Sequence, residues 1–321
     1  MDKFANIFLN TKLYKQLIEQ IKSNNFSQTH IVLSQDEYSN ILFSRLVANA
    51  IICSNSSYCQ CCEDCIKLKS NTHPDLKEFS KDKGFVVANA TEILDDVYKL
   101  AYNNKKVYII NNIDLATLPA QNKLLKILEE PPKNVFFILN STNQSSVLPT
   151  ILSRASKILL TPFDFNFLQS AFSQNNLTLD VNSYVYGEGF IGKILQFDND
   201  KKFQAIFNKT FEILQNVQKS SDIILYSEYI KKEDMPVFLK SLQIFLSDIL
   251  YIKTNNENLV KSAFKQQLKD LSNQFSINAI SSINKKITQA NAHLSANVNY
   301  SIVKDMLLLG ILEAKYIYKD N

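Results

Sequence analysis

The stretch VYIINNIDLATLPAQNKLLKILEEPPKNVFFILN, residues 107–140, decides the fold. Its first run, VYII, is bounded by polar residues, and a continuous apolar run of this kind is typical of a strand buried on both faces of a parallel sheet. The segment 122–130 has helical spacing, and the two prolines that follow must end the helix, because proline lacks an amide and disfavours helix at the preceding residue. The apolar run 135–139 predicts the next strand. This order of strand, helix and strand predicts parallel pairing with a right-handed crossover.

Elements of the same kind lie on both sides of this unit. Within residues 1–165, further short apolar runs occur at 30–33, 76–79 and 157–160, and helical patterns at 13–21, 41–52 and 91–102. This alternation predicts an α/β fold with a parallel sheet and flanking helices. Residues 194–321 contain one proline, Pro236, one glycine, Gly310, and no strand-like alternation. We therefore expect an all-helical second half, with a helix beginning near Pro236 and a last helix over about 301–318.

The composition is that of a globular protein, with 45% hydrophobic and 21% charged residues, and it excludes a disordered or fibrous chain. The 35 basic and 31 acidic residues leave a net charge of +4, which is only a weak attraction toward nucleic acid. No apolar run approaches the length of a membrane span, and the N-terminal residues carry charges where a signal peptide needs an apolar segment. We expect a cytoplasmic, soluble protein with no membrane partner.

The five cysteines all lie between Cys53 and Cys65. Cys53, Cys59, Cys62 and Cys65 follow the spacing Cys-x5-Cys-x2-Cys-x2-Cys, and a Cys-x2-Cys turn places two sulfurs on one metal. Disulfides or inert buried thiols are the alternative, but an odd number of cysteines in a cytoplasmic chain argues against disulfides. We predict a structural Zn²⁺ bound by these four cysteines, with no open position for a substrate. Whether Cys61 replaces one of the four stays open, although adjacent cysteines rarely bind one metal together.

Several of these segments, taken together, resemble a known family. They are the apolar run with His30, the cysteine segment, THPD (72–75), VYIINNID (107–114), NKLLKILEEPP (122–132) and LPTILSR (148–154). Their order resembles that of the clamp-loader subunits of bacterial DNA polymerase III. The resemblance implies a RecA-like AAA+ domain at 1–165 with a zinc module inserted at 53–65. It further implies a small helical lid at 166–203 and an all-α collar at 204–321 that holds a hetero-pentamer together.

The residues that bind ATP in this family are missing at the matching positions. A phosphate loop needs glycines whose amides surround the phosphates, and it ends in Lys and Ser/Thr. The matching loop SQDEYSNI (34–41) has neither glycine nor lysine, and Asn40 and Ile41 take the lysine and magnesium-ligand positions. The second nucleotide motif should end its strand on two acidic residues, and this chain has Asn111 and Asn112 there.

We therefore predict that the chain binds no ATP and is the non-hydrolysing class of subunit. By itself it is then not an enzyme, but a part of a DNA-directed DNA polymerase holoenzyme. The implied partners are the gamma/tau and delta subunits and, through the complex, the sliding clamp and primer–template DNA. An active AAA+ ATPase of the gamma/tau type is the alternative, and the phosphate loop argues against it. A zinc-dependent nucleic-acid-binding module is a third possibility, but the charges around the cysteines are balanced.

Arg154 is the residue to which the resemblance gives a catalytic role. In the family, the Ser-Arg pair at this position projects an arginine finger in trans into the ATP site of the neighbouring subunit. An arbitrary surface arginine is more commonly just paired with a carboxylate, but its position in LPTILSR favours the finger. Ala155 departs from the family pattern, which has cysteine there. We interpret the stretch Gly189–Lys193, which resembles a nucleotide-contacting lid motif, as a helix start, and Glu129 and Glu130 as a helix end.

Overall fold

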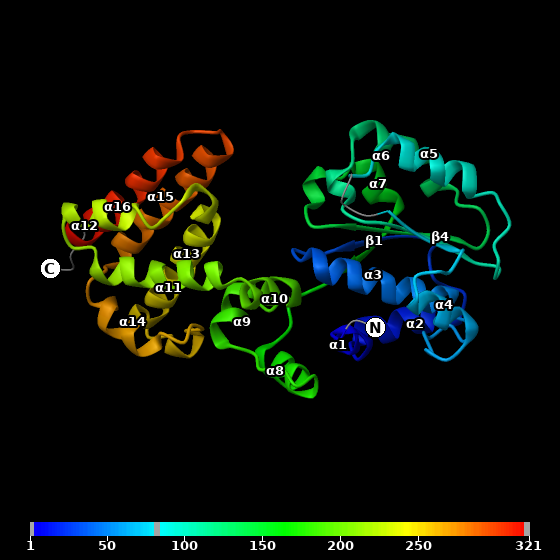
Figure 1. The fold of residues 1–321 in the computed structure, drawn as a ribbon, viewed down its shortest axis with the longest axis horizontal. Coiled ribbons are helices and arrows are strands. Elements are labelled where there is room, and N and C mark those ends of the chain that lie inside the picture. The colour runs from blue at the N-terminus through cyan, green and yellow to red at the C-terminus, as the bar shows by residue number, and fades with distance from the viewer. Residues whose placement is uncertain (1–2, 80–83, 318–321) are drawn as a thin grey trace. The chain divides into compact units, whose positions relative to one another are not determined.

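The computed structural model describes residues 3–79 and 84–317. Contacts divide the chain into two compact units, one of residues 1–178 with 190–192 and the other of residues 179–189 with 193–321 (Figure 1). The predicted division into an AAA+ domain, a lid and a collar stays a prediction.

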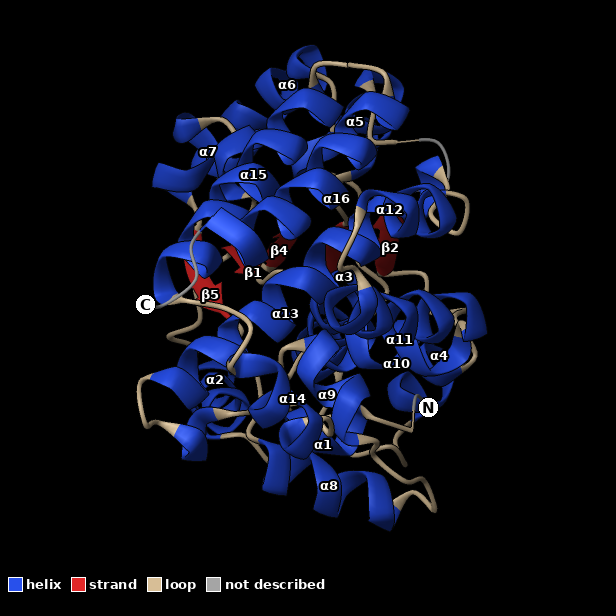
Figure 2. Cartoon of the chain, turned by 90° about the vertical axis from the view of Figure 1, so that its left-hand side faces the viewer, coloured by secondary structure: helices blue, strands red, loops and turns tan. Residues whose placement is uncertain are grey.

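The first unit is built on a five-stranded parallel sheet. In spatial order the strands are β2 (Leu76–Phe79), β3 (Lys106–Ile110), β4 (Val135–Ser141), β1 (Thr29–Leu33) and β5 (Ser156–Leu159). All residues of β1 and β3 are buried, as expected for strands covered on both faces. Figure 2 shows the strands in red. The predicted α/β fold with a parallel sheet and flanking helices is confirmed.

Helices cover both faces of this sheet. Figure 1 shows α1 (Ala5–Leu9), α2 (Lys12–Lys22) and α3 (Glu37–Ile52) on one face, and α5 (Val87–Asp96), α6 (Leu118–Glu129) and α7 (Pro149–Arg154) on the other. The short α4 (Glu63–Lys69) follows the cysteine loop, and α8 (Phe165–Gln174) follows β5. The apolar side of α6 buries Leu124, Ile127 and Leu128 in the same core as β3 and β4. The helix ends at Glu129, before the two prolines, as predicted.

The helix predicted at 91–102 lies earlier in the structure, at Val87–Asp96. It begins earlier because the Asn89 side chain accepts a hydrogen bond from the Val86 amide (2.9 Å) and so satisfies a free donor at the helix start. After its end, the Asp75 carboxylate accepts hydrogen bonds from the amides of Tyr102 and Asn103, both at 2.8 Å. These bonds fix a non-helical path that the apolar spacing of the segment did not indicate.

The second unit is helical throughout its described residues, which confirms the predicted all-α half. Its helices are α9 (Val181–Gly187), α10 (Ile191–Asn199, whose first two residues belong to the first unit), α11 (Lys201–Asn216), α12 (Ser220–Ser227), α13 (Met235–Lys253), α14 (Lys265–Ser272), α15 (Ile277–Ser295) and α16 (Tyr300–Ile317). Helix α13 is central and packs against α11, α14 and α15. Aromatic rings of Phe207, Phe211 and Phe245 meet in its core. The expected last residue of the final helix, 318, lies outside the described residues.

One segment among the described residues, Lys232–Lys253, is long and apolar enough to cross a membrane by length and composition. It contains α13, and Phe238, Leu242 and Phe245 on this helix are fully buried in the second unit. The core helix of a bundle meets the same two criteria. Packing within the unit therefore accounts for its apolar composition.

Candidate functional site

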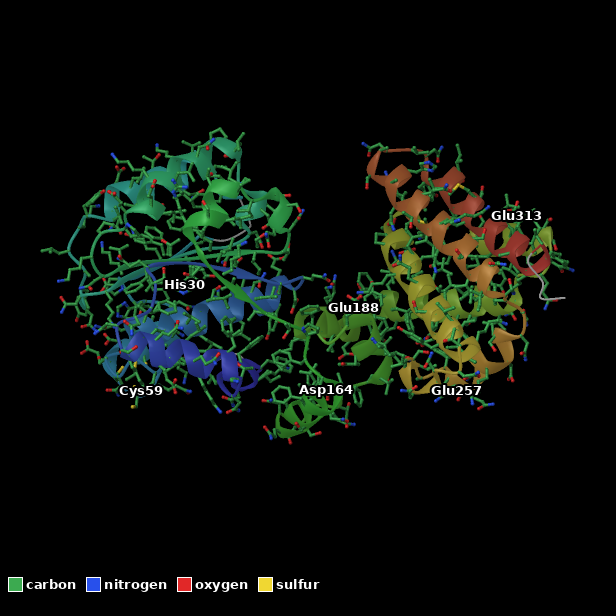
Figure 3. The ribbon with its side chains drawn as sticks, turned by 180° about the vertical axis from the view of Figure 1, so that it is seen from behind. His30, Cys59, Asp164, Glu188, Glu257 and Glu313 are labelled. Atoms are coloured by element: carbon green, nitrogen blue, oxygen red, sulfur yellow. The ribbon has the colours of Figure 1, made fainter. Side chains whose placement is uncertain are left out.

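Four cysteine sulfurs converge between the end of α3 and the start of α4. The Sγ atom of Cys53 lies 3.6 Å from that of Cys59 and 3.8 Å from that of Cys62, and the Sγ atoms of Cys59 and Cys65 are 3.9 Å apart. All four lie within 4.8 Å of one another. Because Zn–S bonds are about 2.3 Å long, a tetrahedral zinc site has sulfur–sulfur edges of about 3.8 Å. The cluster therefore has the size of such a site, and Figure 3 labels Cys59 in it.

The backbone beside Cys59 favours its thiolate, whereas burial raises the pKa of the Cys65 thiol. The backbone amides of Cys61 and Cys62 lower the pKa of the Cys59 thiol to about 5, and the thiolate is the form that binds metal. The Cys65 amide donates a hydrogen bond to the Cys62 sulfur (3.4 Å), which serves as the cap of α4. Cys61 is exposed and lies outside the group of four. The residues present thus fit a tetrahedral metal ion with four sulfur ligands.

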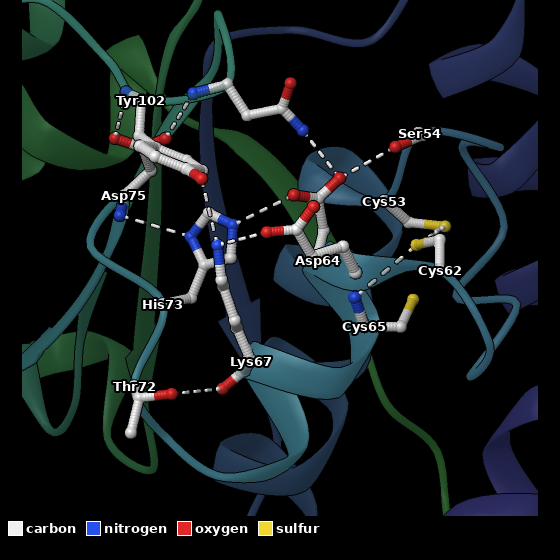
Figure 4. Close-up of polar contacts among 12 residues, drawn as sticks. Cys53, Ser54, Cys62, Asp64, Cys65, Lys67, Thr72, His73, Asp75 and Tyr102 are labelled. Atoms are coloured by element: carbon white, nitrogen blue, oxygen red, sulfur yellow. Dashed lines mark hydrogen bonds and ion pairs between the residues drawn. The ribbon is translucent and has the colours of Figure 1, made fainter.

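A buried polar network lies beside the cysteine cluster (Figure 4). Asp64, which lies between two of the cysteines in the sequence, accepts hydrogen bonds from the Ser54 hydroxyl (2.7 Å) and the Asn103 side-chain amide (2.5 Å). The Asp75 amide donates to Nδ1 of His73 (3.2 Å). This leaves the proton of a neutral His73 on Nε2, which faces the Asp64 carboxylate at 3.4 Å. The network ties the cysteine loop to the start of β2 and to the segment before β3.

Residues 34–41 comprise the loop that follows β1 and the first turn of α3, and they lie where a phosphate loop would. The Asp36 side chain caps α3 by accepting a hydrogen bond from the Ser39 amide (3.3 Å). It also accepts one from the backbone amide of Gly192 (2.9 Å). Asn40 is fully buried, and its side-chain amide donates to the backbone carbonyl of Ser141 (3.0 Å). No positively charged side chain is present in this loop.

Amide side chains fill the neighbouring edge of the sheet. Asn140, near the end of β4, donates to the side-chain oxygen of Asn111 and accepts from the backbone amide of Asn112 (2.9 Å). Asn111 in turn donates to Glu78 (2.7 Å), and the Asn112 side chain donates to Glu37 (2.6 Å). These residues come from the ends of β2, β3 and β4 and from the start of α3. Neutral amides from the ends of β3 and β4 therefore fill this edge of the sheet.

Arg154 ends α7 and is paired within its own chain. Its Nη2 donates to Glu129 (2.9 Å) and its Nη1 to the backbone carbonyl of Thr150 (3.0 Å). The side chain of Arg154 is 29% exposed and that of Glu129 is 57% exposed. Nε of Arg154 is buried and has no hydrogen-bond partner. In the isolated chain, the arginine thus has a surface ion pair and an unused donor.

Neither the contact between Asp36 and Gly192 nor the network of Asp64 and His73 was predicted from the sequence. A signal existed for Asp36, because an aspartate directly before a helical stretch is typical of a helix N-cap. The stretch Gly189–Lys193 does begin a helix, as interpreted, but its amide contact with Asp36 joins residues that are distant in the sequence. The motif THPD (72–75), which contains His73, contributed only to the family resemblance.

Family models and known proteins match most of the length of this chain. A family model described as DNA polymerase III, delta subunit, matches residues 9–164, and one described as DNA polymerase III, delta subunit, C terminal, matches 202–313. DNA polymerase III subunit delta' of Bacillus subtilis is 21% identical over 318 residues, 95% of this chain and 97% of its own length. DNA polymerase III subunit gamma of Buchnera aphidicola is 28% identical over 148 residues, 44% of this chain and 40% of its own length. The solved structure of a gamma subunit-related protein from Thermotoga maritima covers 95% of this chain and 100% of its own at 16% identity, with a TM-score of 0.41.

The strand order, the helical second unit and the cysteine cluster define a RecA-like AAA+ module with an inserted candidate metal site. The chain belongs to the clamp-loader subunits of bacterial DNA polymerase III, and its similarity to a delta' subunit extends over nearly its whole length. The predicted family is confirmed. The chain is therefore a component of a DNA polymerase complex that acts in DNA replication.

Proposed function

We propose that this chain is the non-hydrolysing delta-prime subunit of its clamp loader. It assembles with gamma/tau and delta subunits into a hetero-pentamer in the cytoplasm, and this complex opens the sliding clamp and places it on primed DNA. One observation carries the proposal. Where a nucleotide would bind, residues 34–41 offer carboxylates and no cation, and the adjoining residues at the sheet edge are asparagines. The similarity to gamma and tau subunits over shorter ranges supports the wider family but not an active ATP site.

Charge at this loop opposes a nucleotide. The two carboxylates of Asp36 and Glu37 stand where phosphates would need cations, and Asn40 offers an amide that is already bonded to Ser141. Two like charges about 4 Å apart repel by about 4 kcal/mol near a protein surface. We therefore expect the isolated chain to bind neither ATP nor ADP tightly. A titration with fluorescent nucleotide checks this expectation, and a micromolar Kd would contradict it.

The four-cysteine cluster is the proposed site of a structural Zn²⁺. Cys53, Cys59, Cys62 and Cys65 would supply four thiolates, which complete the tetrahedral coordination that zinc prefers and leave no position for a substrate. A metal held there would join the end of α3 to the start of α4. Its contribution would be to the stability of the cysteine module, and not to a chemical step.

Arg154 is proposed to act in trans on the ATP of the neighbouring subunit. A guanidinium stabilises the charge that develops on the transferred phosphoryl group, an effect worth about 10³–10⁵ in rate. Its present partner, Glu129, is a weak competitor, because an exposed ion pair contributes about 0–1 kcal/mol. The rate factor corresponds to about 4–7 kcal/mol. The loss of the pair with Glu129 is thus small compared with the stabilisation that the arginine would give the transition state.

The test reconstitutes the loader with Arg154→Ala and compares clamp loading and the ATPase activity stimulated by DNA and clamp with wild type. Both activities should fall, by less than the full factor because other sites keep their own arginines, while folding and assembly stay unchanged. The matched control is Arg45→Ala, since Arg45 is the other arginine of the chain and also pairs with a glutamate, Glu78 (2.8 Å). Unchanged activities would make Arg154 only a surface ion pair. A failure to assemble would make it an interface residue.

A further inference from the structure

The carboxylate of Asp36 joins two segments that are far apart in the sequence. Its Oδ2 atom accepts hydrogen bonds from the Ser39 amide (3.3 Å), the Ser39 hydroxyl and the Gly192 amide (2.9 Å). Asp36 is only 4% exposed, and Gly192 lies 156 residues further along the chain. Residues 190–192 belong to the first unit, so this contact lies within one compact body. The cap of α3 requires only the hydrogen bonds from Ser39, so the hydrogen bond from the Gly192 amide is additional to the cap.

The contact between Asp36 and Gly192 is closely fitted. A side chain at Gly192 would collide with the Asp36 carboxylate and with Cβ of Tyr38. Positive φ angles among the glycines occur at Gly84 and Gly189, so Gly192 is required by space and not by its backbone conformation. The Asp36 amide donates to the Ser34 hydroxyl, and that hydroxyl donates to the Asp36 carbonyl, both at 3.0 Å. The carboxylate is thus held in place by its own loop.

We infer that the Asp36 carboxylate is a built-in anion that replaces a nucleotide phosphate at the start of α3. The N-terminus of a helix carries free amides and a partial positive charge, which together favour an anion. In a nucleotide-binding module a ligand supplies this anion and can leave. Here the anion is part of the chain, and it fastens residues 190–192 to α3 whether or not a nucleotide is present. This inference rests on the proposed function at the same loop and deepens it.

The test measures amide hydrogen exchange in the full chain without nucleotide. In Asp36→Ala the Gly192 amide should exchange about 10- to 100-fold faster than in wild type, because a hydrogen bond to a charged acceptor is lost. Asp36→Asn, which keeps the size and one oxygen acceptor, should give a smaller increase and guards against misfolding of the alanine variant. The control is Asp164→Ala, which removes the cap of α8 (Figure 3) and should leave Gly192 unchanged.

A second arm adds inorganic pyrophosphate. It should slow exchange of the Gly192 amide in Asp36→Ala and have no effect on wild type, because only the variant has an empty anion position. If Gly192 exchanges equally fast in wild type and both Asp36 variants, Asp36 is a helix cap only and the inference is wrong. If exchange rises but pyrophosphate does not reverse it, the carboxylate does not stand in for phosphate. Tight nucleotide binding by wild type would overturn the proposed function, and the fluorescent-nucleotide titration detects that failure separately.

Discussion

Replacing Asp64 by alanine should destabilise the first unit by about 3 kcal/mol. The Asp64 carboxylate is 5% exposed and receives three donors, from Ser54, His73 and Asn103. Ser54 is exposed, so its hydroxyl can turn to water. His73 is buried and Asn103 is half-buried, and an unsatisfied buried donor costs about 1–3 kcal/mol. Leaving the donors of His73 and Asn103 unsatisfied therefore accounts for the expected loss in the free energy of unfolding.

Exchange of the β3 amides, such as that of Ile109, measures this loss, because these buried amides report the opening of the first unit alone. The matched control is Glu63→Ala. Glu63 precedes Asp64, but its side chain is 74% exposed and pairs only with Lys67 (2.7 Å), so we expect a change of about 0–1 kcal/mol. Elemental analysis of both variants separates loss of the network from loss of metal. An Asp64→Ala protein with normal metal content and a loss under about 1 kcal/mol would refute the reasoning.

Two further predictions concern metal content and acid stability. Cys62→Ser should lose the bound metal and Cys61→Ser should keep one equivalent, as measured by elemental analysis of protein purified without chelator; the reverse result would show that the ligand assignment is wrong. Burial lowers the pKa of His30 to about 4, so the unfolded chain takes up the proton first as the pH falls. The free energy of unfolding should therefore decline by up to about 3 kcal/mol from about pH 6.5 to pH 4. His30→Phe should remove this contribution, as measured by urea unfolding at pH 7 and pH 4.5.

The strands of the first unit could be predicted closely from the sequence. The run 107–110 and the run 135–139 lie within the observed β3 and β4, because short continuous apolar runs of this length between polar residues are typical of strands covered on both faces. The prediction placed the helix at 87–96 too far along the sequence. Hydrogen bonds that the side chains of Asn89 and Asp75 accept from backbone amides set the path of the chain there. Such bonds depend on residues whose spatial positions the apolar pattern does not encode.

The candidate sites also differ in how far the sequence could predict them. The convergence of four sulfurs follows from local spacing, since Cys59, Cys62 and Cys65 share one short loop and turn. The bond from Gly192 to Asp36 and the bond from Asn103 to Asp64 join segments that only the tertiary fold brings together. An aspartate or asparagine in a loop is compatible with many local structures. Nothing in the linear sequence selects the partner.

The amides at the edge of the sheet are best understood as one set. Asn40, Asn111 and Asn112 are at most 5% exposed. A lysine at position 40 alone would be a buried cation, and aspartates at 111 and 112 alone would be buried anions; either change costs several kcal/mol unless its partner is present. Amides avoid that cost because they carry no net charge. The side chains of Asn111 and Asn140 both donate and accept hydrogen bonds, and those of Asn40 and Asn112 donate to Ser141 and Glu37. On the proposed function, restoring any one charge would therefore destabilise the unit without creating a nucleotide site, since the lysine, the metal-binding acids and the phosphate depend on one another.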